Sequence, residues 1–119
     1  MATLREWIEK YTDGEPIEAV MLGAFGWDGF EQPAGLVLDG VKGKVLSLEE
    51  AIPYISYEFD DGFGIPECSA IVAYTKTWII SVSQYEGSTS PFRIARNPYD
   101  GFVPTMPGGY IIKTEWRME

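Results

Sequence analysis

Three strand-like runs lie close together in the second half of the chain, and very short connections separate them. The runs are Cys68–Thr75, Trp78–Gln84 and Thr89–Arg96. Lys76-Thr77 joins the first two runs, and the turn Tyr85-Glu86-Gly87-Ser88 joins the last two. Connections this short join antiparallel neighbours, because parallel strands need a long crossover. This part of the chain therefore predicts an antiparallel meander.

Two capping boxes predict helices outside this meander. Thr3-Leu4-Arg5-Glu6 opens a helix with apolar residues at helical spacing, and Asp13-Gly14 ends it. Ser47-Leu48-Glu49-Glu50 opens a second, short helix that Pro53 curtails. The chain therefore mixes helices with a strand meander.

Further segments complete the expected fold. Ile17–Leu22 reads as a strand, Gly23–Gly35 as a loop, and the region around Asp39-Gly40 as a turn or hairpin. Tyr54–Phe59 alternates weakly, as an edge strand would, and Tyr110–Trp116 reads as a last strand. We expect one α+β domain over residues 1–119. It is an antiparallel β-meander sheet with an N-terminal helix and one short helix packed on it.

Length and composition set the class of protein. The 119 residues are 45% hydrophobic and 14% aromatic, which suffices for the core of one ordinary domain. No apolar run reaches the roughly 20 residues that a membrane span needs. The first ten residues, MATLREWIEK, have no apolar signal core. With Cys68 as the single cysteine, an intrachain disulfide is excluded, so we expect a cytoplasmic protein with no membrane partner.

The chain has no histidine, which removes the commonest general base and metal ligand. Cys68 has no activating neighbour in the sequence, so we interpret it as a small buried filler. Glu58, Asp60, Asp61 and Glu67 read as a solvated turn, with a divalent-cation site as the alternative. We therefore expect no enzyme activity, no cofactor and no metal.

Charge is unevenly spread along the chain. Residues 1–60 hold 4 basic and 12 acidic side chains, a net charge of −8 out of −9 for the whole chain. The segment 68–99 holds three basic residues against Glu86 alone. The acidic half should repel nucleic acid, so we expect no direct nucleic-acid partner. It either keeps the protein soluble or docks on a basic protein surface.

The basic hairpin is the segment with the clearest functional signal. Strand alternation puts Phe92, Ile94 and Arg96 in one row, so Arg96 ends an otherwise apolar row, whereas Arg93 lies on the more polar side. We interpret the apolar row as core. A guanidinium at the end of a core row needs a partner, either a carboxylate of this chain or a bound anion.

Aromatic residues near these arginines suggest nucleotide binding, since rings stack on bases and guanidinium groups take phosphate. In this hypothesis Arg96 and Arg93 hold phosphate, Asn97 orients the sugar, and three aromatic residues of the hairpin stack on the base. These are Trp78, Tyr85 and Phe92, and Trp27 of the loop Gly23–Gly35 is a further candidate. The alternative is that the strand aromatics are ordinary core.

Several segments also resemble known proteins. YEFDDGFGIPECSAIVAYT, WIISVSQYEGST and RNP followed by PTMPGG are similar to small uncharacterised phage and prophage proteins, over about Glu15 to Gly109. In size, α+β make-up and residue types the chain loosely resembles the anti-Thoeris sponges. That resemblance implies a viral anti-defence protein that sequesters a cyclic nucleotide immune signal between subunits, without chemistry.

Two functional hypotheses follow. The first is a homo-oligomeric sponge for a nucleotide-like small molecule, which serves immune evasion. The second is an acidic inhibitor, of the anti-CRISPR or DNA-mimic type, that binds a host defence enzyme through the acidic half of the chain.

Overall fold

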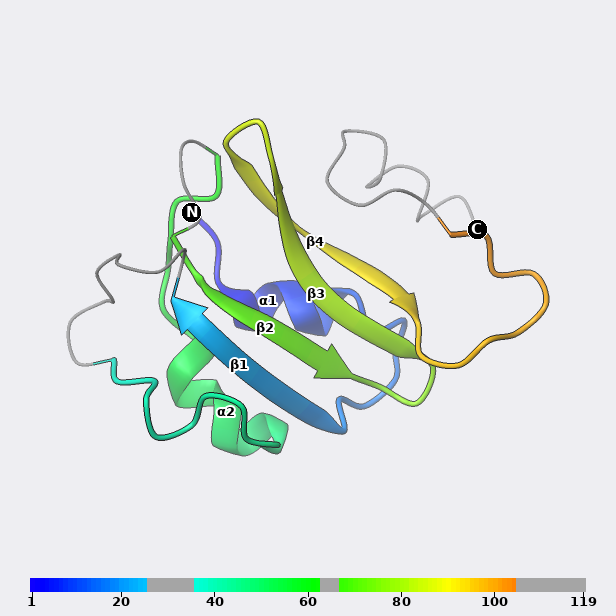
Figure 1. The fold of residues 1–119 in the computed structure, drawn as a ribbon, viewed down its shortest axis with the longest axis horizontal. Coiled ribbons are helices and arrows are strands. Elements are labelled where there is room, and N and C mark those ends of the chain that lie inside the picture. Colours follow the sequence, from blue (N-terminus) through cyan, green and yellow to red (C-terminus); the bar gives the residue numbers. More distant parts are fainter. Residues whose placement is uncertain (26–35, 63–66, 105–119) are drawn as a thin grey trace.

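The computed structural model describes residues 1–25, 36–62 and 67–104 of the chain. In these ranges it contains two helices and four strands (Figure 1). In chain order they are α1 (Leu4–Lys10), β1 (Ala19–Phe25), α2 (Leu48–Ile55), β2 (Ser69–Tyr74), β3 (Trp78–Tyr85) and β4 (Ser88–Ala95). Within the described ranges, no helix is long and apolar enough to span a membrane.

The four strands form one antiparallel sheet in the order β1-β2-β3-β4, so the predicted meander is confirmed. The tightest connection is the two-residue turn Glu86-Gly87, where φ is 49° and 83°. Positive φ at both central residues is the type I′ geometry that matches the twist of a hairpin. This turn sets the register of the last hairpin, with Tyr85 opposite Ser88 and Trp78 opposite Ala95.

Both helices begin where their capping residues predict. The Thr3 side chain accepts a hydrogen bond from the Glu6 amide, which satisfies one free donor at the start of α1. In α2 the bonds between Ser47 and Glu50 are reciprocal. Pro53 does not curtail α2: it lies inside the helix, which continues to Ile55. The buried side chain of Ile55 anchors this last turn in the core.

The helices and the sheet enclose the core on one side of the sheet, and Figure 1 shows α1 and α2 on that same side. Leu4 and Ile8 of α1 and Ala51 and Ile55 of α2 are fully buried. They belong to one cluster with alternate residues of the strands, namely Val20, Leu22, Ile71, Ala73 and Ile80. Strand alternation therefore gives the sheet one face packed on helices.

We call the other side of the sheet the open face. Cross-strand register places the intervening residues of all four strands on it. Twelve of them define the open face: Ala19, Met21, Gly23, Ala70, Val72, Tyr74, Ile79, Ser81, Ser83, Ser90, Phe92 and Ile94. By register, the positions of Tyr85 and Ser88 beside the turn fall on the same side. Both helices of the described chain lie on the opposite side.

Some expectations differ from the structure. The first strand starts at Ala19 and continues to Phe25, and the β2–β3 connection has three residues, Thr75 to Thr77, one more than predicted. Tyr54–Phe59 is not an edge strand, because its first two residues complete α2 and only Phe59 makes a bridge, to Ala2. Phe59 is buried in the core, so packing of its ring fixes this segment.

The region around Asp39-Gly40 is a turn, but its two arms do not pair with each other as a hairpin. Leu46 and Lys42 instead form bridges with Val20 and Leu22 of β1. The segment thereby provides hydrogen-bond partners for backbone groups on the outer edge of β1. The predicted strand Tyr110–Trp116 lies outside the described residues, as does most of the predicted loop Gly23–Gly35.

Candidate functional site

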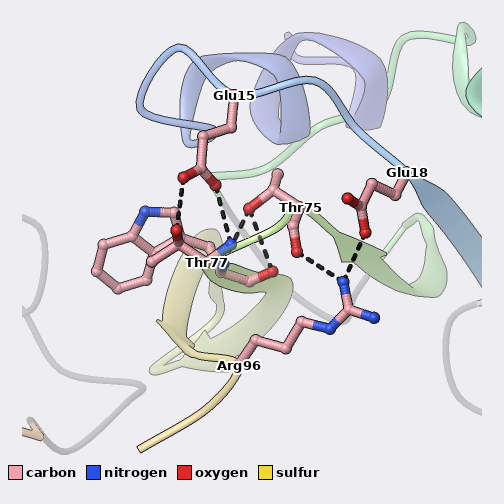
Figure 2. A network of polar contacts seen from close by, with 6 residues as sticks. Glu15, Glu18, Thr75, Thr77 and Arg96 are labelled. Carbon is pink, nitrogen blue, oxygen red and sulfur yellow. Dashed lines mark hydrogen bonds and ion pairs between the residues drawn. The ribbon is translucent and has the colours of Figure 1, made fainter. Parts of the chain in front are cut away.

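Arg96 follows β4 and reaches across the end of the sheet. Its Nη1 donates to Glu18 Oε1 at 2.7 Å and to the Thr75 carbonyl at 2.8 Å (Figure 2). Its guanidinium carbon also lies 5.6 Å from the ring centroid of Tyr74. The predicted need for a partner is thus met by a carboxylate of the same chain. The side chains of Arg96 and Glu18 remain 39% and 51% exposed, so this ion pair is accessible to solvent.

Glu15 stabilises the turn beside this ion pair. Its Oε1 accepts from the Thr77 amide at 3.0 Å, and its Oε2 accepts from the Thr77 hydroxyl (Figure 2). The hydrogen bond from the Thr77 hydroxyl is the main cause that holds the pKa of Glu15 below its ordinary value. Glu15 is therefore a structural carboxylate that ties the chain before β1 to the β2–β3 turn.

Arg93 lies on the helix side of the sheet, not on a polar outer face. Its guanidinium carbon is 4.2 Å from the ring centroid of Trp78, which is in the geometry of a cation–π contact. Its Nη1 donates to the Tyr11 carbonyl at 3.0 Å. Because Tyr11 is the C-cap of α1, Arg93 pins that helix end to β4. Both contacts give Arg93 a structural role.

The apolar row that ends in Arg96 is not a core row, which corrects the sequence-based interpretation. Register places Phe92 opposite Ser81 and Ile94 opposite Ile79, so this row lies on the open face. Ile94 is 40% exposed. The core row of the hairpin is the one that contains Ile80, which is fully buried. The physical reason is register: the two-residue turn places Trp78 and Phe92 on opposite faces.

The expected binding residues therefore do not form one cluster. Arg93 and Trp78 are together on the helix side, whereas Phe92 and Arg96 belong to the open face and its margin. Asn97 is exposed directly after Arg96. Trp27 lies outside the described residues, and for Tyr85 only the backbone position in β3 is described.

Two aromatic residues, Tyr99 and Phe102, follow Arg96 closely in the chain, and sequence reasoning did not select them. Tyr99 is 49% exposed, and its ring centroid lies 5.9 Å from that of Phe102. Phe102 in turn lies 6.2 Å from Trp78. The signal was available, because Tyr99 follows Asn97-Pro98 within three residues of Arg96. Arg96, Asn97 and Tyr99 form an exposed segment, which we call the Arg96 corner.

Cys68 and Asp60, two of the residues considered for chemistry, have structural surroundings. Cys68 is buried, and burial raises the pKa of its thiol to about 12, so it is not a nucleophile near neutral pH. Asp60 accepts a hydrogen bond from the Gly62 amide, as expected of a turn. Across residues 1–25, 36–62 and 67–104, no three Cys, Asp or Glu side chains lie close enough to hold a metal ion.

Comparison with family models, with curated proteins and with solved structures finds no match to this chain.

Proposed function

We propose that this protein acts by binding and not by catalysis, and that it takes a nucleotide-like anion at the Arg96 corner. The observation that carries this proposal is that the guanidinium of Arg96 uses only one of its three nitrogens for the hydrogen bonds found in the described residues. Both of its hydrogen bonds come from Nη1, to Glu18 and Thr75. The edge formed by Nε and Nη2 has no partner among the residues described, and this edge matches two oxygens of a phosphate.

The neighbouring side chains supply the other contacts that a nucleotide requires. The exposed ring of Tyr99 offers a surface on which a base can stack. The exposed amide of Asn97 can donate to, or accept from, a sugar hydroxyl. In this proposal the ring of Phe102 lies between Tyr99 and Trp78 and holds Tyr99 in place. Arg93 in turn packs on Trp78.

Glu18 allows a further test, because its negative charge lies beside the guanidinium and opposes the binding of an anion there. The ion pair is exposed, and such pairs contribute only about 0–1 kcal/mol. A phosphate on the edge formed by Nε and Nη2 leaves the bond from Nη1 to Glu18 in place, so the carboxylate opposes it only through its charge. Removal of the carboxylate should strengthen anion binding, whereas removal of the guanidinium should abolish it.

The biological setting suggested by the sequence resemblance is phage anti-defence. In that setting the protein sequesters a cyclic nucleotide immune signal in the cytoplasm of the infected bacterium. The described part of the chain has no reactive thiol, and sequestration needs none. The resemblance to phage proteins and the exposed Arg96 corner both support this role.

The test is titration calorimetry with a panel of cyclic dinucleotides and cyclic ADP-ribose. We expect wild type to bind one of them, Arg96→Ala to lose binding, and Glu18→Gln to bind more tightly. Arg5→Ala is the matched control, because it removes an arginine from an exposed ion pair on α1. Equal affinity of wild type and Arg96→Ala, or weaker binding by Glu18→Gln, would contradict the proposal.

The alternative, an acidic inhibitor of a host defence enzyme, is favoured by a separate observation. Several acidic side chains on or near the helices are exposed, among them Glu49 and Glu58. Glu15 and Glu18 are engaged within the chain and do not belong to such a surface. If this alternative holds, Glu49→Lys with Glu58→Lys weakens inhibition of the enzyme, while Arg96→Ala does not.

A further inference from the structure

We propose that the open face of the sheet is the contact surface of a homodimer in which two copies pack face to face. The face carries large apolar side chains that are only partly buried in the single chain, including Met21, Val72 and Ile79. Ile94, at its edge, is 40% exposed. Contiguous apolar surface of this kind typically marks an interaction site. The occupant that fits it best is a second copy, for reasons of charge, shape and strand edges.

The first reason is charge. The chain has a net charge of −9, so two copies repel each other over most of their surface. All twelve residues that define the open face are uncharged. The nearest charges named above, Arg96 and Glu18, lie at its margin and neutralise each other. A charge-free face lets two acidic copies meet without pressing like charges into the contact.

The second reason is shape, because side-chain size changes along the strands. At the end near Arg96, Tyr74, Ile79 and Ile94 form one row across three strands. At the other end the residues are small. They are Gly23, Ala70, Ser83 and Ser90, one row before the strand ends at Tyr85 and Ser88, and a Cβ built on Gly23 would lie 3.0 Å from Ala70 Cβ.

This gradient makes the face complementary to itself. A two-fold axis that runs across the strands, in the plane of the contact, turns the large end of one copy over the small end of the other. Such an isologous contact needs only one surface per copy, as is usual for dimers. Around the central row, Ile94 of each copy then faces Ser90 of the other.

The third reason is that the strand edges are poorly suited to pairing. The outer edge of β1 is occupied by Leu46, whose amide and carbonyl both bond to Val20. At the other edge, β4 carries Pro91, which is opposite Val82 and has no amide hydrogen to donate. A proline in an edge strand opposes strand addition. We therefore expect two copies to associate through the open face and not by pairing of their edge strands.

The size of the face sets the strength of the dimer. Four strands of six to eight residues, about 4.8 Å apart and rising about 3.3 Å per residue, cover about 400 Å² per copy. The pair thus buries about 800 Å² of flat area. Interfaces below about 1,200 Å² belong to weak complexes. The dimer should therefore form and dissociate with protein concentration.

Sedimentation equilibrium over a range of protein concentrations tests this inference. Ile94→Lys and Val72→Lys should each lower the association constant at least about tenfold, because each places an ammonium in an apolar contact. Val45→Lys is the matched control: Val45 is 71% exposed, lies outside the open face, and receives the same new charge. Far-ultraviolet circular dichroism verifies that each variant is folded.

A mixing experiment tests the orientation. Ile94→Lys and Ser90→Glu should each associate less than wild type, whereas an equimolar mixture should recover a heterodimer, since the new charges face each other across the proposed axis. Sodium chloride should strengthen the wild-type dimer by screening its net charge, but should weaken anion binding at Arg96. These opposite salt dependences separate this inference from the proposed function.

A monomeric wild type at all concentrations, or a dimer that Ile94→Lys and Val72→Lys leave intact, would overturn the inference. Failure of the mixture to associate would overturn the proposed orientation.

Discussion

The guanidinium of Arg96 and the carboxylate of Glu18 meet across the end of the sheet, with 2.7 Å between Nη1 and Oε1. The two residues are 78 positions apart in the sequence. Because both side chains are exposed, the pair should contribute little to the stability of the fold, and the guanidinium stays accessible to a ligand. We therefore expect Arg96→Ala and Glu18→Gln each to change the free energy of unfolding by no more than about 1 kcal/mol. Urea unfolding measures this, and a much larger loss would assign Arg96 a structural role.

Arg93 should behave differently, because it is held between Trp78 and α1. Arg93→Ala removes the stacking contact and the hydrogen bond to the Tyr11 carbonyl, so we expect a loss of about 2 kcal/mol in the free energy of unfolding. Arg93→Lys should lose less, since it keeps the charge. Arg5→Ala, in an exposed pair with Glu9, should stay within about 0.5 kcal/mol of wild type. Equal losses for Arg93→Ala and Arg5→Ala would contradict this assignment.

Glu15 should make stability depend on pH in the acidic range. Hydrogen bonds from Thr77 hold the pKa of Glu15 below its ordinary value of 4.5 in the folded state. A lowered folded pKa means that the stabilisation is present above the unfolded pKa and disappears as pH falls through the folded pKa. The stability advantage of wild type over Glu15→Gln should therefore shrink below about pH 4.5.

Unfolding curves recorded between roughly pH 3 and pH 7 check this prediction. Glu58→Gln, which removes an exposed carboxylate, is the control and should differ less from wild type. An advantage over Glu15→Gln that does not vary with pH would exclude the proposed role of the carboxylate.

Cys68 should be unreactive while the protein is folded. Its thiol is buried, and burial raises the pKa to about 12, so almost no thiolate exists near pH 8. An aromatic disulfide reagent should label it slowly in buffer and rapidly in concentrated urea. Fast labelling of the folded protein would show that the segment around Cys68 opens readily.

Much of the fold was predictable because local chemistry determines it. The capping residues Thr3 and Ser47 mark the starts of both helices, and Glu86-Gly87 marks the tight turn of the last hairpin. The weakly alternating Tyr54–Phe59 misled the prediction, since its alternation reflects a helix end and one buried ring. Weak period-2 signals over a few residues do not separate strand from irregular core segments.

The candidate site was less predictable. Trp78 and Phe92 lie on opposite faces of the sheet because the two-residue turn sets the register of the hairpin. The turn residues could therefore have predicted this separation, but the row that contains Phe92 was interpreted as core. The pairing of Arg96 with Glu18 could not be derived in the same way. It depends on how β1 packs beside β2, and no local pattern encodes a contact across 78 positions.

The most direct test of the central claim is mass spectrometry of small molecules that copurify with the protein. Wild type, Arg96→Ala and Arg5→Ala are each mixed with an extract of phage-infected cells, repurified and denatured. We predict that wild type and Arg5→Ala release a cyclic nucleotide in stoichiometric amount and that Arg96→Ala releases none. Wild type that releases no nucleotide, or an equal yield from Arg96→Ala, would contradict the claim that this corner of the sheet is a nucleotide site.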